Sequence, residues 1–357
     1  MRQTLFEISF GRPWTFWSID PASGWPEVGV IWVWMIVLAA YAVYDYWRLR
    51  NAAVRPSLGT TALWILAGIP GGLILQQILP GKTLPVFGYG FLVMLGFLTA
   101  VITAQGRLAR IGIDPELAWD AGMWLLIGGV FGGRLFYLVQ YRKQVYQGVS
   151  TIQDAVIATV NLTAGGLVLI GALAGGGLGF LAFCRARKLS IPDVADAFMP
   201  SVFIGIGFGR IGCLLNGCCF GDRCELPWGI AFPSGSVPFK ILAERGFVAP
   251  NAPFTMPLHP TQIYSALDGF LIALVTTVLF YERRWKGEVF AWGCVIYSIT
   301  RFLMEFLRGD EMGQLGTGLT ISQLYSLGIA ALGAFVLVWH GRRANQATAL
   351  TPDSRPA

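Results

Sequence analysis

Charge is scarce in this chain: Asp, Glu, Lys and Arg make up 13% of the 357 residues, whereas hydrophobic residues make up 55%. The mean hydropathy is +0.59, and no stretch is polar enough for a separate soluble domain. A chain of this composition buries most of its surface in lipid rather than in a core of its own. The sequence therefore predicts a polytopic membrane protein.

Other common features are also missing. The first apolar stretch begins near Val28, after Glu7, Asp20 and Glu27, so the N-terminus lacks the charged-then-apolar order of a signal peptide, and we expect it to stay uncleaved.

Four of the six cysteines follow a C-x4-CC-x4-C pattern without the CxxC pairs of zinc sites: Cys213, Cys218, Cys219 and Cys224. A metal site, a disulfide and free thiols are all open readings, and we predict no metal.

Nine apolar stretches reach the roughly 20 residues that a bilayer crossing needs. They are residues 28-47, 60-79, 86-105, 120-140, 162-183, 197-215, 262-281, 288-307 and 319-339. The stretch at 60-79 is the weakest, because Pro70, Gly71 and Gly72 interrupt it. We predict an all-α integral membrane protein, a helical bundle of about 7-9 transmembrane helices.

The net charge of +6 comes from basic residues grouped between alternate apolar stretches, such as Arg107 with Arg110 and Arg283 with Arg284. This pattern is a topology signal, and it indicates an outer N-terminus and an inner C-terminus. We expect no nucleic-acid partner.

The predicted organisation has three parts. Residues 1-85 form an N-terminal segment with one or two extra transmembrane helices, 86-341 form the main membrane domain, and 342-357 form a polar tail. A long outer loop at 216-261 is rich in Pro, Gly and aromatic residues, which is typical of a functional loop. Glycines spaced four apart, as at Gly128 and Gly132 or Gly171 and Gly175, predict closely packed helices.

Arg210 lies within an apolar run, in the motif GRIGCLLNGCCFG at 209-221. A guanidinium stays charged, and its insertion mid-helix costs about 2.5–3.5 kcal/mol, so it needs an anionic partner. A lipid phosphate is one such partner. Arg301, Glu305 and Arg308 share a helical face, and Arg301 and Glu305 could simply neutralise each other. If Arg210 lies near them, the arginines outnumber the glutamate, and an anionic substrate would balance the excess positive charge.

The segment HPTQIY at 259-264 starts a predicted helix and contains one of the only two histidines in the chain. Histidine is the usual proton carrier near neutral pH, and Gln262 and Tyr264 add hydrogen-bonding groups beside His259. We therefore include all three in the candidate site.

These motifs together resemble the prolipoprotein diacylglyceryl transferase family. The resemblance is carried by GGLVLIGALAGG from 165, GRIGCLLNGCCFG from 209, HPTQIY from 259, YSITRFLMEFLRGDE from 297 and LTISQLYSL from 319. It covers the chain from about residue 86, where FGYGF also fits.

The resemblance implies transfer of the sn-1,2-diacylglyceryl group from phosphatidylglycerol to the lipobox cysteine of a prolipoprotein signal peptide, without a cofactor, in the bacterial cytoplasmic (inner) membrane. The expected catalytic residues are Arg210, Arg301, His259 and Glu305. The expected substrate-binding residues are Tyr89, Asn216, Gly221, Gln262, Tyr264, Tyr297 and Arg308.

The chain departs from the family pattern at four positions. Ile170 stands where members carry a histidine, Cys213 and Cys218 where they carry an asparagine and a glutamate, and Ser265 where they carry a glutamate. These departures leave His259, or the field of the arginines, to assist removal of the thiol proton. A lipid or anion transporter or flippase and a diverged family member with a changed substrate are the alternative readings.

Overall fold

The computed structural model describes residues 4–9, 15–19, 26–37, 39–40, 43, 83–148, 151–161, 166–308 and 318–349. The chain divides into two compact units. One comprises Met1–Leu92, Ile211–Cys218 and Ala231–Thr255, and the other comprises Val93–Arg210, Cys219–Ile230 and Met256–Ala357. We call them the N-terminal unit and the helical unit.

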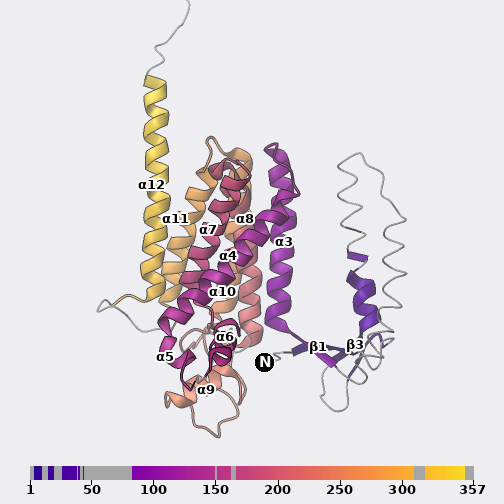
Figure 1. Cartoon of the computed structure of the whole chain (residues 1–357). Coiled ribbons are helices and arrows are strands. Elements are labelled where there is room, and N and C mark those ends of the chain that lie inside the picture. The colour runs from indigo at the N-terminus through magenta and orange to yellow at the C-terminus, as the bar shows by residue number, and fades with distance from the viewer. Residues whose placement is uncertain are drawn as a thin grey trace, which may run out of the picture. The chain divides into compact units, whose positions relative to one another are not determined.

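The N-terminal unit contains a small sheet that the all-α prediction missed. Its strands β1 (Thr4–Ser9), β2 (Ser18–Ile19), β3 (Pro26–Gly29) and β4 (Thr83–Phe87) lie in the order β2-β3-β1-β4. In Figure 1, β1 and β3 lie side by side, and they pair in parallel. These strands are too short for the hydropathy signal that identifies spanning helices. The one or two extra helices expected in residues 1-85 stay a prediction, because most of that stretch lies outside the described residues.

Six helices among the described residues are long and apolar enough to cross a membrane. They are α3 (Gly88–Arg110), α4 (Leu117–Gln140), α7 (Leu169–Ala186), α8 (Ile191–Asn216), α10 (Thr261–Glu282) and the Ile321–His340 part of α12 (Ile321–Ala349). Figure 1 shows α4, α7, α8, α10, α11 and α12 gathered in one bundle. The fold is thus a helical membrane protein.

Three predicted spans are not among these six. The stretch at 60-79 lies outside the described residues, and only part of 28-47 is described, beginning as strand β3 and continuing as helix over 30–37. The stretch at 288-307 forms α11 (Glu288–Glu305), which is helical but carries Glu288, Arg301 and Glu305. Those charges, rather than its length, separate α11 from the others.

Glycines bring α4 and α7 into backbone contact. A Cβ at Gly132 would lie less than 2.5 Å from the carbonyl oxygen of Gly171, and one at Gly128 would lie 2.5 Å from that of Gly175. Any larger residue would therefore push the helices apart. The predicted close packing is confirmed for this pair.

Short helices follow α4, namely α5 (Arg142–Val145) and α6 (Ile152–Val160). Arg134 of α4 donates to the carbonyl oxygens of Ala158 at 2.6 Å and Thr159 at 2.9 Å, at the end of α6. A cation that satisfies terminal carbonyls is a helix cap, so this membrane arginine has a structural role.

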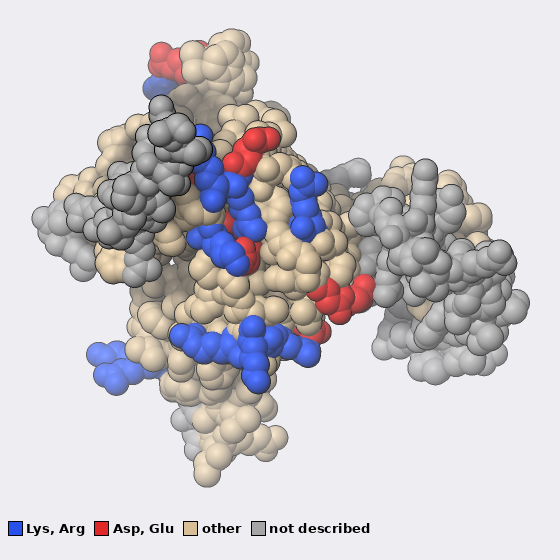
Figure 2. All heavy atoms as spheres, turned by 90° about the horizontal axis from the view of Figure 1, so that it is seen from above, with Lys and Arg blue, Asp and Glu red and all other residues tan. Residues whose placement is uncertain are grey.

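Basic side chains gather at the end of the bundle seen from above in Figure 2. Where α10 is followed by α11, the buried carboxylate of Asp196 accepts hydrogen bonds from Arg283 at 2.8 Å and from the backbone N–H groups of Gly287 and Phe290 at 2.7 and 2.9 Å. An acid at a helix N-terminus is stabilised by such donors, so Asp196 fixes the start of α11 against α8.

Candidate active site

Arg301 is held by three side chains of the protein. Its Nη1 donates to Glu305 Oε2 at 2.5 Å, its Nη2 to Ser322 Oγ at 2.8 Å and its Nε to Tyr325 Oη at 3.1 Å. Arg301 is 6% exposed and Glu305 is 3% exposed. A buried pair with this many additional hydrogen bonds keeps one geometry, so Arg301 is a fixed cation.

The start of α12 supports this pair. Thr320 and Gln323 form a capping box, in which Gln323 N–H donates to Thr320 Oγ1 at 3.2 Å and Thr320 N–H donates to Gln323 Oε1 at 3.0 Å. Thr320 Oγ1 also donates to Glu305 Oε1 at 2.8 Å. The motif LTISQLYSL therefore supplies the residues that orient Arg301 and Glu305.

Arg210 is in a different situation. It lies half-buried on α8, and among the residues that the structure describes its guanidinium has no hydrogen bond or ion pair. The described residues thus use none of the five N–H donors of this guanidinium, which lies within a spanning helix. The sequence-based expectation that Arg210 needs an external anionic partner fits this geometry.

Both arginines line one small pocket in the helical unit. Arg210 comes from α8, Ser265 and Asp268 from α10, and Tyr297 and Arg301 from α11. Ile206 and Met304 complete the lining with apolar atoms. Three helices thus bring two permanent cations, a phenol and a carboxylate to one place, an arrangement that can hold an anion and stabilise charge on a departing group.

Asp268 is a charged residue within the apolar segment of α10 and is not among the site residues predicted from the sequence. Its Oδ2 accepts a hydrogen bond from Thr300 Oγ1 at 2.9 Å. The helical spacing of Ser265 and Asp268 behind the HPTQIY motif was the available signal, since residues three apart share a helix face.

His259 belongs to a second cluster, at the start of α10. Its Nδ1 lies 3.4 Å from Tyr264 Oη, which accepts a hydrogen bond from Trp228 Nε1 at 2.6 Å. The fully buried Gln262 lies on the same first turn. These residues are not among those that line the arginine pocket, so the predicted site residues form two groups within the helical unit. The other histidine, His340, stacks on Trp285.

Gly221, the last residue of the Arg210 motif, connects that motif to the His259 cluster by a hydrogen bond. Gly221 N–H donates to the His259 carbonyl at 2.9 Å, and Asp222 N–H donates to the Leu307 carbonyl at 2.9 Å. A Cβ at Gly221 would lie 2.6 Å from both His259 Cβ and Leu307 O. Only glycine fits between these chain segments, which is a packing reason for a residue that we expect at the substrate site.

Three further predicted residues are not among those that line the arginine pocket. Tyr89 belongs to the N-terminal unit, where it packs beside Gly212, and Asn216 is the last residue of α8 in the same unit. Arg308 follows α11, and its backbone N–H donates to the backbone carbonyl of Glu305 at 3.0 Å. Their expected contacts with substrate stay predictions.

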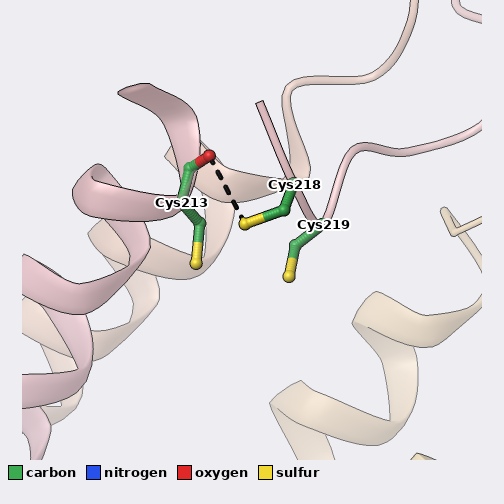
Figure 3. A group of neighbouring side chains, drawn as sticks. All are labelled: Cys213, Cys218 and Cys219. Carbon is green, nitrogen blue, oxygen red and sulfur yellow. Dashed lines mark hydrogen bonds between the residues drawn. The ribbon is translucent and has the colours of Figure 1, made fainter. Parts of the chain in front are cut away.

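The four departures from the family pattern fall in different surroundings. Ile170 is 43% exposed near the start of α7, and Ser265 lines the arginine pocket. None of the six cysteines, all of them described, is in a disulfide. Figure 3 shows the thiol of Cys218 directed at the carbonyl oxygen of Cys213, at 3.8 Å.

Comparisons with known proteins agree with these motifs. The family described as prolipoprotein diacylglyceryl transferase matches residues 76–339. The phosphatidylglycerol–prolipoprotein diacylglyceryl transferase of Clostridium tetani is 34% identical over 71% of this chain and 92% of its own length. A second such enzyme from Clostridium perfringens is 33% identical over 68% of this chain and 87% of its own.

A further relative extends the similarity into the N-terminal segment. The enzyme of the same name from Rhodopirellula baltica is 26% identical over 99% of this chain and 92% of its own length. Most of the chain is thus covered by similarity to one kind of protein, and the matched region contains both arginines, His259 and the start of α12. The chain belongs to the prolipoprotein diacylglyceryl transferase family.

Proposed function

We propose that this protein is a transferase of lipoprotein maturation, which moves the sn-1,2-diacylglyceryl group of phosphatidylglycerol to the thiol of a prolipoprotein cysteine and forms a thioether. The observation that carries the proposal is the pocket in which Arg210 and Arg301 lie together. Phosphatidylglycerol offers the anion that this pair of cations would hold, at a depth where water is scarce.

The two arginines have separate roles in this proposal. Arg210 binds the phosphate, because its donors are not used by the described residues. Arg301 is fixed by Glu305, Ser322 and Tyr325, and it contributes a preorganised positive charge that needs no rearrangement as the phosphate leaves. Tyr297, on the same face of α11, is placed to hydrogen-bond the headgroup.

In the transfer, the sulfur attacks the glycerol carbon of the diacylglyceryl group while the carbon–oxygen bond to phosphate breaks. The bond's electron pair leaves with the phosphate oxygen, and glycerol phosphate is released. Phosphate leaves readily only when its growing charge is neutralised, which the arginines do in this pocket. The cluster of His259, Gln262 and Tyr264 would contact the incoming signal peptide at its lipobox.

The orientation predicted from the sequence, with an outer N-terminus and an inner C-terminus, would give an outward-facing reaction in the bacterial cytoplasmic membrane. Arg107 and Arg110 lie in the last turn of α3, Arg185 lies in the last turn of α7, and Arg283 follows α10. Basic side chains gather at the end of the bundle seen from above in Figure 2. Basic residues favour the cytoplasmic side. Arg210, near the opposite end of α8, would then face the outer half of the membrane.

The test is transfer of labelled diacylglyceryl from phosphatidylglycerol to a synthetic lipobox peptide by the purified full-length protein. We expect transfer by the wild type and a loss of at least about 10²-fold for Arg210→Ala, in line with removal of a preorganised donor. Arg142→Ala is the matched control, since Arg142 is exposed on α5. Absence of transfer by the wild type, or equal rates for Arg210→Ala and the wild type, would refute the proposal.

A further inference from the structure

The pocket contains one titratable group that the proposed chemistry has not used. Among the described residues that line it, Asp268 is the sole carboxylate. Glu305, the other acid nearby, is occupied by Arg301 through one oxygen and by Thr320 through the other. Asp268 is therefore the candidate proton acceptor of the pocket.

The geometry of Asp268 leaves one oxygen available. Oδ2 accepts the hydrogen bond of Thr300, whose hydroxyl also donates to the Tyr297 carbonyl at 3.1 Å. The described residues offer Oδ1 no hydrogen bond and offer the carboxylate no ion pair within 4.0 Å, although Arg210 and Arg301 line the same pocket. A partly buried carboxylate without a charge partner is costly to maintain, and such groups concentrate at functional sites.

The other groups that line the pocket cannot accept a proton as readily as Asp268. The titratable and charged groups that face the pocket are Arg210 of α8 and Tyr297 and Arg301 of α11. Arginine does not give up its proton, and the phenol of Tyr297 is a proton donor at neutral pH. His259 does not line the pocket and its Nδ1 lies beside Tyr264. The carboxylate is the group of the pocket that can accept a proton.

We propose, building on the transfer reaction above, that Asp268 is the base that takes the proton of the acceptor thiol. The thiol proton moves to Oδ1 as the sulfur forms its bond to the glycerol carbon, and the electron pair of the breaking carbon–oxygen bond leaves with the phosphate. The proton then passes from Asp268 to the departing phosphate or to water, which restores the carboxylate. Because proton transfer accompanies attack, a full thiolate need not form first.

The experiment compares two acceptor peptides that differ only in the nucleophile, cysteine or selenocysteine. A selenol is far more acidic than a thiol and is already ionised at neutral pH, so it needs no base. The purified full-length protein is assayed with labelled phosphatidylglycerol as wild type, Asp268→Asn and Asp268→Glu, with Asp154→Asn on the exposed part of α6 as control.

The expected result is selective. Asp268→Asn should transfer to the cysteine peptide at least about 10²-fold more slowly than the wild type but to the selenocysteine peptide within a few-fold, because only the first needs a general base. The remaining cysteine rate should rise with pH up to the thiol pKa of about 8.5. Asp268→Glu should recover part of the rate.

Two results would overturn the inference while leaving the transfer activity intact. Asp268→Asn could match the wild type with the cysteine peptide, or it could lose activity equally with both peptides, which is the behaviour of a structural residue. If the wild type itself transferred to neither peptide, the proposed function would be refuted instead. Failure of the Asp268 inference can therefore be distinguished from failure of the proposed function.

Discussion

At the scale of single residues, three arginines within spanning or site helices show how differently one side chain can be used. Arg134 caps the end of α6, Arg301 is held by side chains of α11 and α12, and Arg210 has no hydrogen bond or ion pair among the described residues. Each would be costly in a lipid environment without partners. This difference is why we propose Arg210, rather than Arg134, as the arginine that binds the phosphate.

The Arg301–Glu305 pair gives a prediction at this scale. Glu305→Gln leaves a 6% exposed guanidinium without its counter-charge, and breaking such a buried pair costs about 3–5 kcal/mol. We expect a clearly lower thermal unfolding temperature in detergent, together with loss of transfer. Glu225→Gln breaks the exposed pair with Arg223 and should change stability by less than about 1 kcal/mol. Equal effects of the two variants would contradict the assigned role of Glu305.

At the scale of elements, the site depends on where helices begin and how closely they approach. The capping box at the start of α12 fixes the residues that hold Arg301, and the glycines of α4 and α7 fix a neighbouring contact in the helical unit. Each feature can be removed by a single substitution.

Thr320→Val tests the capping box. It removes the cap of α12, worth about 0.5–2 kcal/mol, and the hydrogen bond to Glu305 Oε1. We expect a several-fold loss of transfer, because Arg301 and Glu305 lose their support. The matched variant is Thr151→Val, which removes the cap of the exposed α6 and should leave the transfer rate near that of the wild type. A rate for Thr320→Val as high as that of Thr151→Val would show that the cap does not position the site.

Gly132→Ala tests the contact between α4 and α7. The added Cβ would collide with backbone atoms of Gly171 and Gly175, and overpacking of this kind costs about 1–3 kcal/mol. We expect a lower unfolding temperature. Gly177→Ala, on α7 but with no atom within 4 Å of the added Cβ, should be neutral or stabilising. The close-contact interpretation fails if the two alanines behave alike.

At the scale of the whole molecule, the central prediction is orientation. An outer N-terminus and an inner C-terminus place the chain after residue 146 outside and the chain after residue 188 inside the cell. Alkaline phosphatase, which is active only outside, should work when fused after residue 146, whereas a cytoplasmic fluorescent reporter should work after residue 188. The reverse pattern would contradict the assigned topology.

Several residues of the candidate site could be predicted from the sequence, because a charged residue inside an apolar segment is costly and therefore rare. Arg210, Arg301 and Glu305 were found in this way, and the structure brings the first two to one pocket. Asp268 was not among the predicted site residues, because which helix faces meet depends on how α8, α10 and α11 pack against one another. No local pattern specifies that arrangement.

The fold was predicted less completely. Spanning helices give a strong hydropathy signal, and six of them are found among the described residues. The sheet of β1 to β4 was missed because its strands are two to six residues long and pair across the distant segments 4–29 and 83–87. The separation of the His259 cluster from the arginine pocket likewise arises from packing.

The binding of the lipid phosphate by Arg210 and Arg301 is tested most directly by an experimentally determined structure of the protein with phosphatidylglycerol bound. We predict phosphate oxygens about 2.7–2.9 Å from the guanidinium of Arg210, with Arg301 still bonded to Glu305 and with Asp268 facing the glycerol carbon. A headgroup bound away from Arg210, with that side chain turned from the pocket, would contradict the account.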